Sequence, residues 1–144
     1  MTFLPLLSRR TVLAALLACA SVAGIASARA QEHAPPLDES KRVQAADIDA
    51  LLAQGQVVVL DVREPSELAE TGTVKGAIHI PLGQLEARLG ELPTDKVILT
   101  ACRGGGRASR ALALLEAKGF KTAGFCGLKD YTGQRVFPAP APKS

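Results

Sequence analysis

One cysteine of this chain stands where a thiol can act as a nucleophile. It opens a short run that contains three glycines and two arginines: Cys102, Arg103, Gly104, Gly105, Gly106 and Arg107. An apolar stretch of strand length, 96–100, precedes the run, and a helix-forming stretch, 108–115, follows it. This order places the thiol at a helix N-terminus, where unpaired N–H groups and the helix dipole favour an anion. A thiolate is such an anion, so Cys102 is predicted to be a reactive, catalytic nucleophile.

The glycines and arginines of the run suit an anionic substrate. Gly104, Gly105 and Gly106 allow successive backbone N–H groups to point inward and form a nest around a charged atom. Arg103 and Arg107 add fixed positive charge. A small buried hydrophobe at a strand end is the alternative interpretation of the cysteine. It leaves the surrounding glycines and arginines without an explanation.

Strand-like and helix-like segments alternate along the chain. Strands are expected at residues 42–44, 57–60, 76–81, 96–100 and 120–126. Helices are expected at residues 47–54, 65–70, 82–89 and 108–115. This alternation is typical of an α/β fold in which helices cover both faces of a parallel sheet. Active sites of such sheets lie beyond the carboxyl ends of the strands, so Asp61 and Arg63 are expected on the same rim as Cys102.

Residues 1–30 have the layout of a signal peptide. Arg9 and Arg10 precede an uncharged apolar stretch at 12–28, and Ala-x-Ala patterns suited to cleavage follow it. The arginine pair resembles a twin-arginine export signal, with an ordinary secretory signal as the alternative. The stretch is short and rich in small residues, so no stable membrane span is expected. The predicted location is the bacterial periplasm, and a lipoprotein site at Cys19 is the less favoured alternative.

The chain after the signal is expected to form one domain at residues 41–134, between a flexible lead-in at 31–40 and a frayed tail at 135–144. Removing 30 of the 144 residues leaves 114, in which Lys plus Arg falls from 17 to 14 and equals Asp plus Glu at 14. There is no basic block, so no nucleic-acid partner is expected. The two histidines, His33 and His79, are isolated and there is no Cys-x-x-Cys pair, so no metal site is expected.

Two motifs resemble those of the rhodanese family of sulfurtransferases. Residues 61–67 and 72–81 are similar to the family's Asp-x-Arg turn and its following Gly-His-Ile-x-Gly-Ala segment. Residues 102–107 are similar to its Cys-x-x-Gly-x-Arg active loop. The resemblance implies a rhodanese-like three-layer α/β/α fold with a small, mainly parallel central sheet. Thr73, where the family usually has His, and the altered end at 126–131 depart from the pattern.

The resemblance also implies a sulfurtransferase reaction without a cofactor. The Cys102 thiolate would take the outer sulfur of a small anionic donor such as thiosulfate, and sulfite would leave. The persulfide would then pass its sulfur to cyanide, a thiol or a sulfur-accepting protein. Arg107 would contact the donor or brace the loop by pairing with a carboxylate, for which Asp61 is the candidate. The sequence leaves open whether Asp61 and Arg63 brace the loop or contact substrate.

Three other functions remain compatible with the sequence. Cysteine phosphatases and arsenate reductases use a longer loop than the four residues that separate Cys102 from Arg107. Cys126 is a candidate resolving cysteine, which would give a thiol-redox relay or a disulfide with Cys102. A non-catalytic binding or sensing module would keep the fold without sulfur transfer, and the intact loop counts against it.

Overall fold

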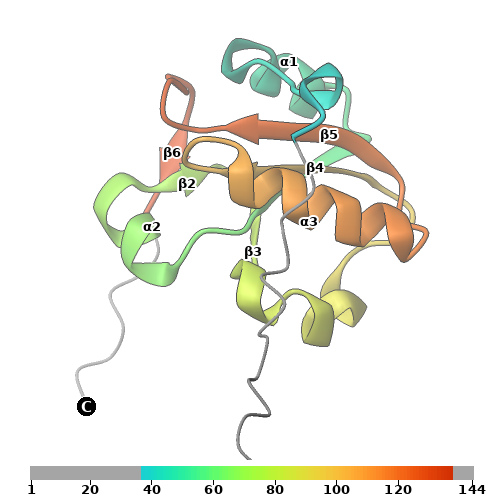
Figure 1. The fold of residues 1–144 in the computed structure, drawn as a ribbon. Coiled ribbons are helices and arrows are strands. Elements are labelled where there is room, and N and C mark those ends of the chain that lie inside the picture. The colour runs from blue at the N-terminus through green and yellow to red at the C-terminus, as the bar shows by residue number, and fades with distance from the viewer. Residues whose placement is uncertain (1–36, 138–144) are drawn as a thin grey trace, which may run out of the picture. The chain divides into compact units, whose positions relative to one another are not determined.

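A four-stranded parallel sheet lies at the centre of residues 37–137, the part of the chain that the computed structural model describes (Figure 1). Its spatial order is β3-β1-β4-β5. The four strands are β1 (Val57–Asp61), β3 (Ile78–His79), β4 (Val97–Cys102) and β5 (Thr122–Gly127). Every neighbouring pair of this sheet is parallel, which confirms the mainly parallel sheet expected from the alternation of elements.

The two central strands, β1 and β4, are apolar because helices cover both of their faces. Side chains of a parallel pair alternate between the faces, and in-register partners share a face. Val59 and Leu99 are partners in one core cluster, whereas Leu60 and Ile98 contribute to the cluster on the other face. All four are fully buried, so the sheet has a core on each side.

Helices pack on both sides of the sheet. The longest, α3 (Gly106–Ala117), buries Ala108, Ala111, Leu112 and Leu115 against one face. The short helix α1 (Ile48–Ala53) buries Ile48 against the other face, and Figure 1 shows α1 and α3 on opposite sides of β4 and β5. This arrangement is the α/β/α layering that the sequence predicts.

The helix α2 (Pro65–Thr71) follows β1 and begins with a proline at its first position. Its capping box is held by the Glu67 side chain, which accepts from the backbone N–H of Glu64 at 3.0 Å, while the Glu67 N–H donates to the Glu64 carbonyl at 3.0 Å. Leu68 is buried beneath the helix. The capping box therefore fixes the position of the Glu67 carboxylate at the start of the helix.

The segments around the core differ in detail from the expectations. The helix expected at 82–89 is a pair of 3₁₀ segments, η3 (Leu82–Gln84) and η4 (Glu86–Glu91), with non-helical angles at Arg88. Gly83, Gly90 and the short length of the segment disfavour a continuous α-helix. The strand expected at 42–44 is reduced to one bridge between Arg42 and Phe125. Two short 3₁₀ helices precede α1. The first, η1 (Glu39–Lys41), begins in the expected lead-in, and the second, η2 (Ala45–Asp47), leads directly into α1.

The chain beyond β5 is held by a second, two-stranded sheet. Strand β6 (Arg135–Val136) pairs antiparallel with β2 (Thr73–Val74), although the sequence suggests that a frayed tail begins at residue 135. The Arg135 guanidinium donates to the carbonyl oxygens of Leu128 at 2.6 Å and Tyr131 at 2.9 Å. A two-residue strand carries no periodic signal, so it is recognised only once its partner is known.

The signal peptide expected at residues 1–30 lies outside the described residues. Within residues 37–137, no helix is long and apolar enough to span a bilayer.

Candidate active site

Cys102 is the last residue of β4, and its thiol faces the N-terminus of α3. The sulfur accepts hydrogen bonds from the backbone N–H groups of Gly105, with N–Sγ at 3.1 Å, and of Ala108, with N–Sγ at 3.4 Å. The residue is 2% exposed. The strand–loop–helix order and the inward N–H groups agree with the sequence, but one of the two donors, Ala108, lies just beyond the glycine run. The site thus offers a negatively charged sulfur two backbone donors and the positive end of a helix.

Gly105 is the glycine on which the loop geometry depends. Its φ of 102° lies in the left-handed region, where a side chain is disfavoured, and it is the N-cap residue of α3. This conformation turns the chain from β4 into α3 while its N–H points at Cys102. Gly104 and Gly106 have open space where a Cβ would lie, so crowding does not explain why they are glycines.

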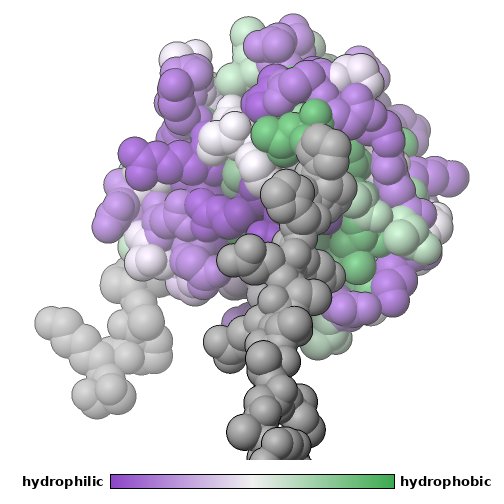
Figure 2. All heavy atoms as spheres, in the orientation of Figure 1, coloured by the Kyte–Doolittle hydropathy of each residue, from purple (hydrophilic) through white to green (hydrophobic). Residues whose placement is uncertain are grey.

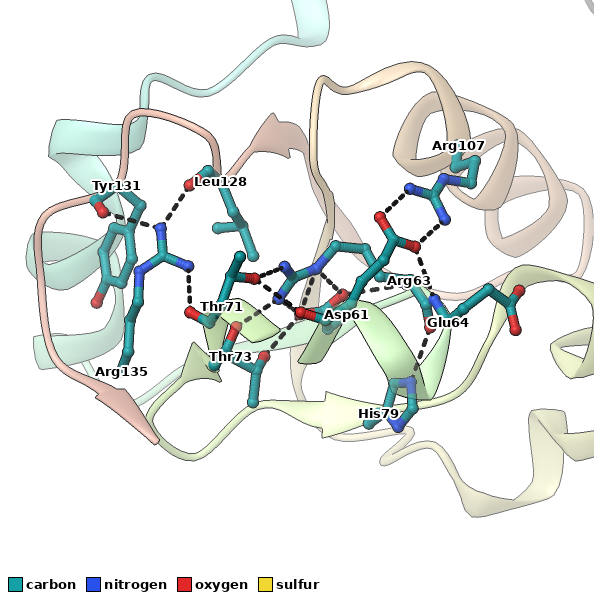
Figure 3. A network of polar contacts seen from close by, with 12 residues as sticks. Asp61, Arg63, Glu64, Thr71, Thr73, His79, Arg107, Leu128, Tyr131 and Arg135 are labelled. Carbon is teal, nitrogen blue, oxygen red and sulfur yellow. Dashed lines mark hydrogen bonds and ion pairs between the residues drawn. The ribbon is translucent and has the colours of Figure 1, made fainter. Parts of the chain in front are cut away.

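Arg107 braces the loop, but its partner is Glu67 rather than Asp61. The guanidinium donates to both carboxylate oxygens, with Nη1–Oε2 at 2.5 Å and Nη2–Oε1 at 2.7 Å (Figure 3). These hydrogen bonds lower the pKa of Glu67 to about 2. The prediction that Arg107 pairs with Asp61 is therefore wrong, because the capping box at the start of α2 places the Glu67 carboxylate next to α3 instead. Arg107 connects the two helices that flank the loop.

Asp61 and Arg63 form a buried ion pair. Arg63 Nη2 lies 2.6 Å from Asp61 Oδ2, and their side chains are 3% and 0% exposed. The Thr73 hydroxyl donates to the same carboxylate at 2.7 Å, and Arg63 also donates to the Thr71 hydroxyl at 2.8 Å and the Gly72 carbonyl at 2.7 Å (Figure 3). Of the two roles left open by the sequence, this network supports bracing. Thr73, the departure from the family pattern, takes part in it.

His79 also has a structural contact. Its Nε2 lies 2.8 Å from the carbonyl oxygen of Arg63, so that nitrogen donates to the backbone and holds the turn after β1. Within the described part of the chain, no group of three or more His, Cys, Asp or Glu residues is placed to hold a metal ion.

Two hollows flank Arg103, which is exposed at the surface. One, of about 280 Å³, lies between α2 and the chain after β5. It is lined by Arg63, Glu67, Glu70, Thr71, Arg103, Leu128, Lys129 and Arg135. The other, of about 230 Å³, lies between the segment 42–45 and the chain after β5. It is lined by Arg42, Val43, Gln44, Ala45, Arg103, Gly104, Gly127, Lys129 and Asp130.

Arg103 and Lys129 are the two cations common to both hollows. Neither side chain forms an ion pair with a carboxylate of residues 37–137. The surface over α2 and the start of α3 is largely hydrophilic, as Figure 2 shows. Of the two loop arginines, Arg103 is therefore the one with a free charge for a substrate, and Lys129 is a second cation that the sequence motifs did not reveal.

Cys126 lies on the other face of the sheet from Cys102. It is in register with Ala101, whereas Cys102 is in register with Gly127, and neighbouring positions of a strand point to opposite faces. Cys126 packs in the cluster that contains Ile48, and Cys102 packs in the cluster of α3. Both thiols are free, and burial raises the pKa of Cys126 to about 12. The geometry argues against Cys126 as a resolving cysteine.

Comparisons with known proteins agree with this geometry. The model of the rhodanese-like domain matches residues 44–132. A sulfurtransferase of Allochromatium vinosum is 33% identical over 64 residues, which cover 44% of this chain and 59% of that protein. The human thiosulfate:glutathione sulfurtransferase is 29% identical over 101 residues, with 60% of this chain and 83% of that protein covered. The crystal structure of reduced Bacillus anthracis CoADR-RHD is 41% identical, with a TM-score of 0.59, and covers 63% of this chain and 16% of that one.

This chain spans only part of several relatives: 59% of the Allochromatium protein, and 42% of a Bacillus subtilis relative that is 37% identical over 78 residues. The family match nevertheless contains the buried Asp61–Arg63 pair, the Cys102 loop and the whole parallel sheet. The fold and both motifs are thus matched together over most of the described residues, and the chain belongs to the rhodanese-like domain family.

Proposed function

We propose that this protein transfers a sulfane sulfur from a small anionic donor such as thiosulfate to a thiol or cyanide, through a persulfide on Cys102. The placement of the Cys102 sulfur against two backbone N–H groups at the start of α3 carries this proposal. Relatives that are named sulfurtransferases support the same class of reaction.

In the first step the Cys102 thiolate attacks the outer sulfur of the donor. A sulfur–sulfur bond forms at Cys102 while the donor's own sulfur–sulfur bond breaks, and its electron pair leaves with sulfite. The two N–H groups stabilise the thiolate before the attack. Arg103 and Lys129 attract the anionic donor to the site, since both charges are free of partners among the described carboxylates.

In the second step a thiolate or cyanide attacks the outer sulfur of the persulfide. The acceptor–sulfur bond forms, the persulfide bond breaks, and the electron pair returns to the Cys102 sulfur. The same N–H groups of Gly105 and Ala108 now stabilise Cys102 as the leaving thiolate. No second cysteine is needed, which agrees with the position of Cys126 on the other face of the sheet.

Intact mass of the reduced protein before and after thiosulfate tests this proposal. We expect a gain of one sulfur atom, its loss when cyanide is added, and no gain in Cys102→Ser. Cys126→Ser is the matched control, because it alters the other free thiol of residues 37–137 and should still gain sulfur. A wild-type protein that gains no sulfur from thiosulfate or from any other sulfane donor, although Cys102 is free, would favour a non-catalytic module.

We also propose that the protein acts after export, in the bacterial periplasm. The support is the sequence of residues 1–30, with two arginines before an uncharged apolar stretch and cleavage patterns after it. Expression of the full chain followed by cell fractionation and intact mass tests this. We expect a periplasmic protein that has lost about 30 residues, and retention of the precursor when Arg9 and Arg10 are both changed to lysine. Uncleaved wild-type protein in the cytoplasm would refute the proposal.

A further inference from the structure

Arg42 lies outside both sequence motifs but is fixed beside the active loop. Its backbone forms a parallel bridge with Phe125 in β5, and the next residue, Val43, donates its N–H to the Phe125 carbonyl at 2.8 Å. The segment between η1 and η2 is thereby attached to the edge of the sheet. It borders the hollow that Arg103 and Lys129 also line.

The guanidinium of Arg42 is held in one place by three groups. Glu39 accepts from Nε at 2.5 Å and from Nη2 at 3.0 Å. The guanidinium carbon lies 4.9 Å from the centre of the Phe125 ring, within the range of a cation–π contact. Nη1 lies 3.4 Å from the carbonyl oxygen of Gly104. Because Phe125 is fully buried, its ring is a rigid platform for the charge.

The held guanidinium lies directly against the loop residue that contacts the sulfur. A Cβ built on Gly105 would lie 2.7 Å from Arg42 Nη1 and 3.0 Å from Nη2. The N–H of this same Gly105 donates to Cys102 Sγ. The pKa of Arg42 is raised, chiefly by its hydrogen bonds to Glu39. Arg42 is therefore close enough to influence the sulfur, although it does not touch it.

We propose that Arg42 is a positioning residue for the sulfur of Cys102. Its contacts with Gly104 and Gly105 hold the turn so that the Gly105 N–H points at Sγ, and its positive charge favours the anionic form of the sulfur. The benefit to turnover rests on the proposed sulfur transfer, whereas the effect on the thiolate does not. Arg42 acts through Gly104 and Gly105, whereas Arg107 acts through Glu67.

The pH dependence of Cys102 alkylation by a neutral thiol reagent tests the proposal. Peptide mass spectrometry follows the Cys102 site alone, so modification of Cys126 does not interfere. Arg42→Gln is expected to move the midpoint of the pH profile upward and to slow alkylation below the midpoint by about three- to tenfold. A purely structural residue would alter the melting temperature and leave the midpoint unchanged, and that result would overturn the proposal.

Two further variants separate charge from shape. Arg88→Gln is the matched control, because Arg88 forms the same kind of i,i+3 bidentate pair with Glu91 on η4, away from the loop; it should leave the profile unchanged, and an equal shift would overturn the proposal. Arg42→Lys keeps the charge but cannot hold Glu39 and Gly104 together. It should recover only part of the midpoint shift, because the charge remains while the aim of the Gly105 N–H is lost. If Arg42→Gln does not fold, a wild-type midpoint in Arg42→Lys would overturn the proposal.

The alkylation assay is independent of sulfur transfer. A shifted profile in Arg42→Gln, together with a wild-type protein that takes no sulfur, would leave the role of Arg42 standing and refute the proposed function. Sulfur transfer by the wild type together with an unshifted profile in Arg42→Gln would support the proposed function and refute the role of Arg42.

Discussion

Replacing Glu67 with glutamine removes the charge that holds Arg107 and is expected to destabilise the fold in a pH-dependent way. The pair joins the first turn of α2 to the first turn of α3, with two hydrogen bonds of 2.5 and 2.7 Å between Arg107 and Glu67. Glu67→Gln keeps the shape of the side chain and one carbonyl acceptor. The loss of stability therefore reports on the charge rather than on packing.

The size of the effect follows from the pKa of Glu67, which falls from 4.5 to about 2. Each unit corresponds to about 1.4 kcal/mol, so the full difference corresponds to about 3 kcal/mol at neutral pH. The side chains of Arg107 and Glu67 are 33% and 26% exposed, so solvent screens part of the attraction. We expect Glu67→Gln to lower the free energy of unfolding by about 1–2 kcal/mol at pH 7.

The sign of the pH dependence is fixed by the direction of the shift. The pKa of Glu67 is lower in the folded protein than in the unfolded chain, so the unfolded chain binds more protons when the pH is lowered. The stabilisation is complete above the unfolded value near 4.5 and is lost as the pH falls towards 2. The difference between wild type and Glu67→Gln should shrink by about half or more between pH 7 and pH 3.

Urea unfolding at pH 7, 5, 4 and 3 measures this difference. Glu91→Gln is the matched control: Glu91 forms a bidentate pair with Arg88 on η4, is 52% exposed, and should show no measurable change. A Glu67→Gln difference that is the same at pH 3 and pH 7 would show that the stabilisation is not electrostatic. The absence of any difference at pH 7 would refute the role of Arg107 as a brace.

Three other predictions follow from the buried pair, the free cation and the second cysteine. Arg63→Gln is expected to cost about 3 kcal/mol or more in urea unfolding, because it leaves the fully buried Asp61 carboxylate without its counter-charge. Lys129→Gln is expected to raise the KM for thiosulfate about two- to fivefold in steady-state assays, with a smaller effect at high salt, and an unchanged KM would exclude Lys129 from donor binding. Cys126→Ser is expected to leave kcat/KM unchanged, since Cys126 packs on the opposite face of the sheet from Cys102, and lost turnover would support a relay.

The sequence predicts the fold and the nucleophile because both depend on local patterns. The buried strands β1 and β4 appear as unbroken apolar runs, and the glycine run after β4 indicates a sharp turn into α3. The order strand, turn and helix places a cysteine at this turn next to a helix N-terminus. Cys102 was therefore predictable from a short window of residues.

The partner of Arg107 was not predictable in the same way. Glu67 is 40 residues away in the sequence, and Asp61 was an equally suitable carboxylate. Two features make the choice: Arg63 neutralises Asp61 within the core, and the capping box holds Glu67 at the surface of α2. The spacing of Glu64 and Glu67 around Pro65 was the one local signal that indicated where the Glu67 carboxylate would lie.

Arg42 and Lys129 were missed for a different reason. Arg42 reaches the loop only because a single bridge to Phe125 attaches its segment to β5, and an isolated bridge leaves no periodic pattern in the sequence. Lys129 follows β5, and its backbone N–H donates to the carbonyl of Arg103 at 3.1 Å. Both residues join the site through contacts between chain segments that lie far apart in the sequence.

The two arginine–carboxylate pairs next to the loop should therefore affect different properties. Glu67→Gln leaves the charge of Arg107 in place but loosens the contact between α2 and α3, so its effect is expected mainly on stability. Arg42 lies against Gly105, whose N–H contacts the sulfur, so its loss is felt mainly in the charge of Cys102. The effects of Glu67→Gln and Arg42→Gln should be additive in the free energy of unfolding and in the alkylation midpoint, because the two ion pairs share no residue. A large coupling energy between the two substitutions would instead mean that the loop responds as one unit and that the two arginines do not act independently.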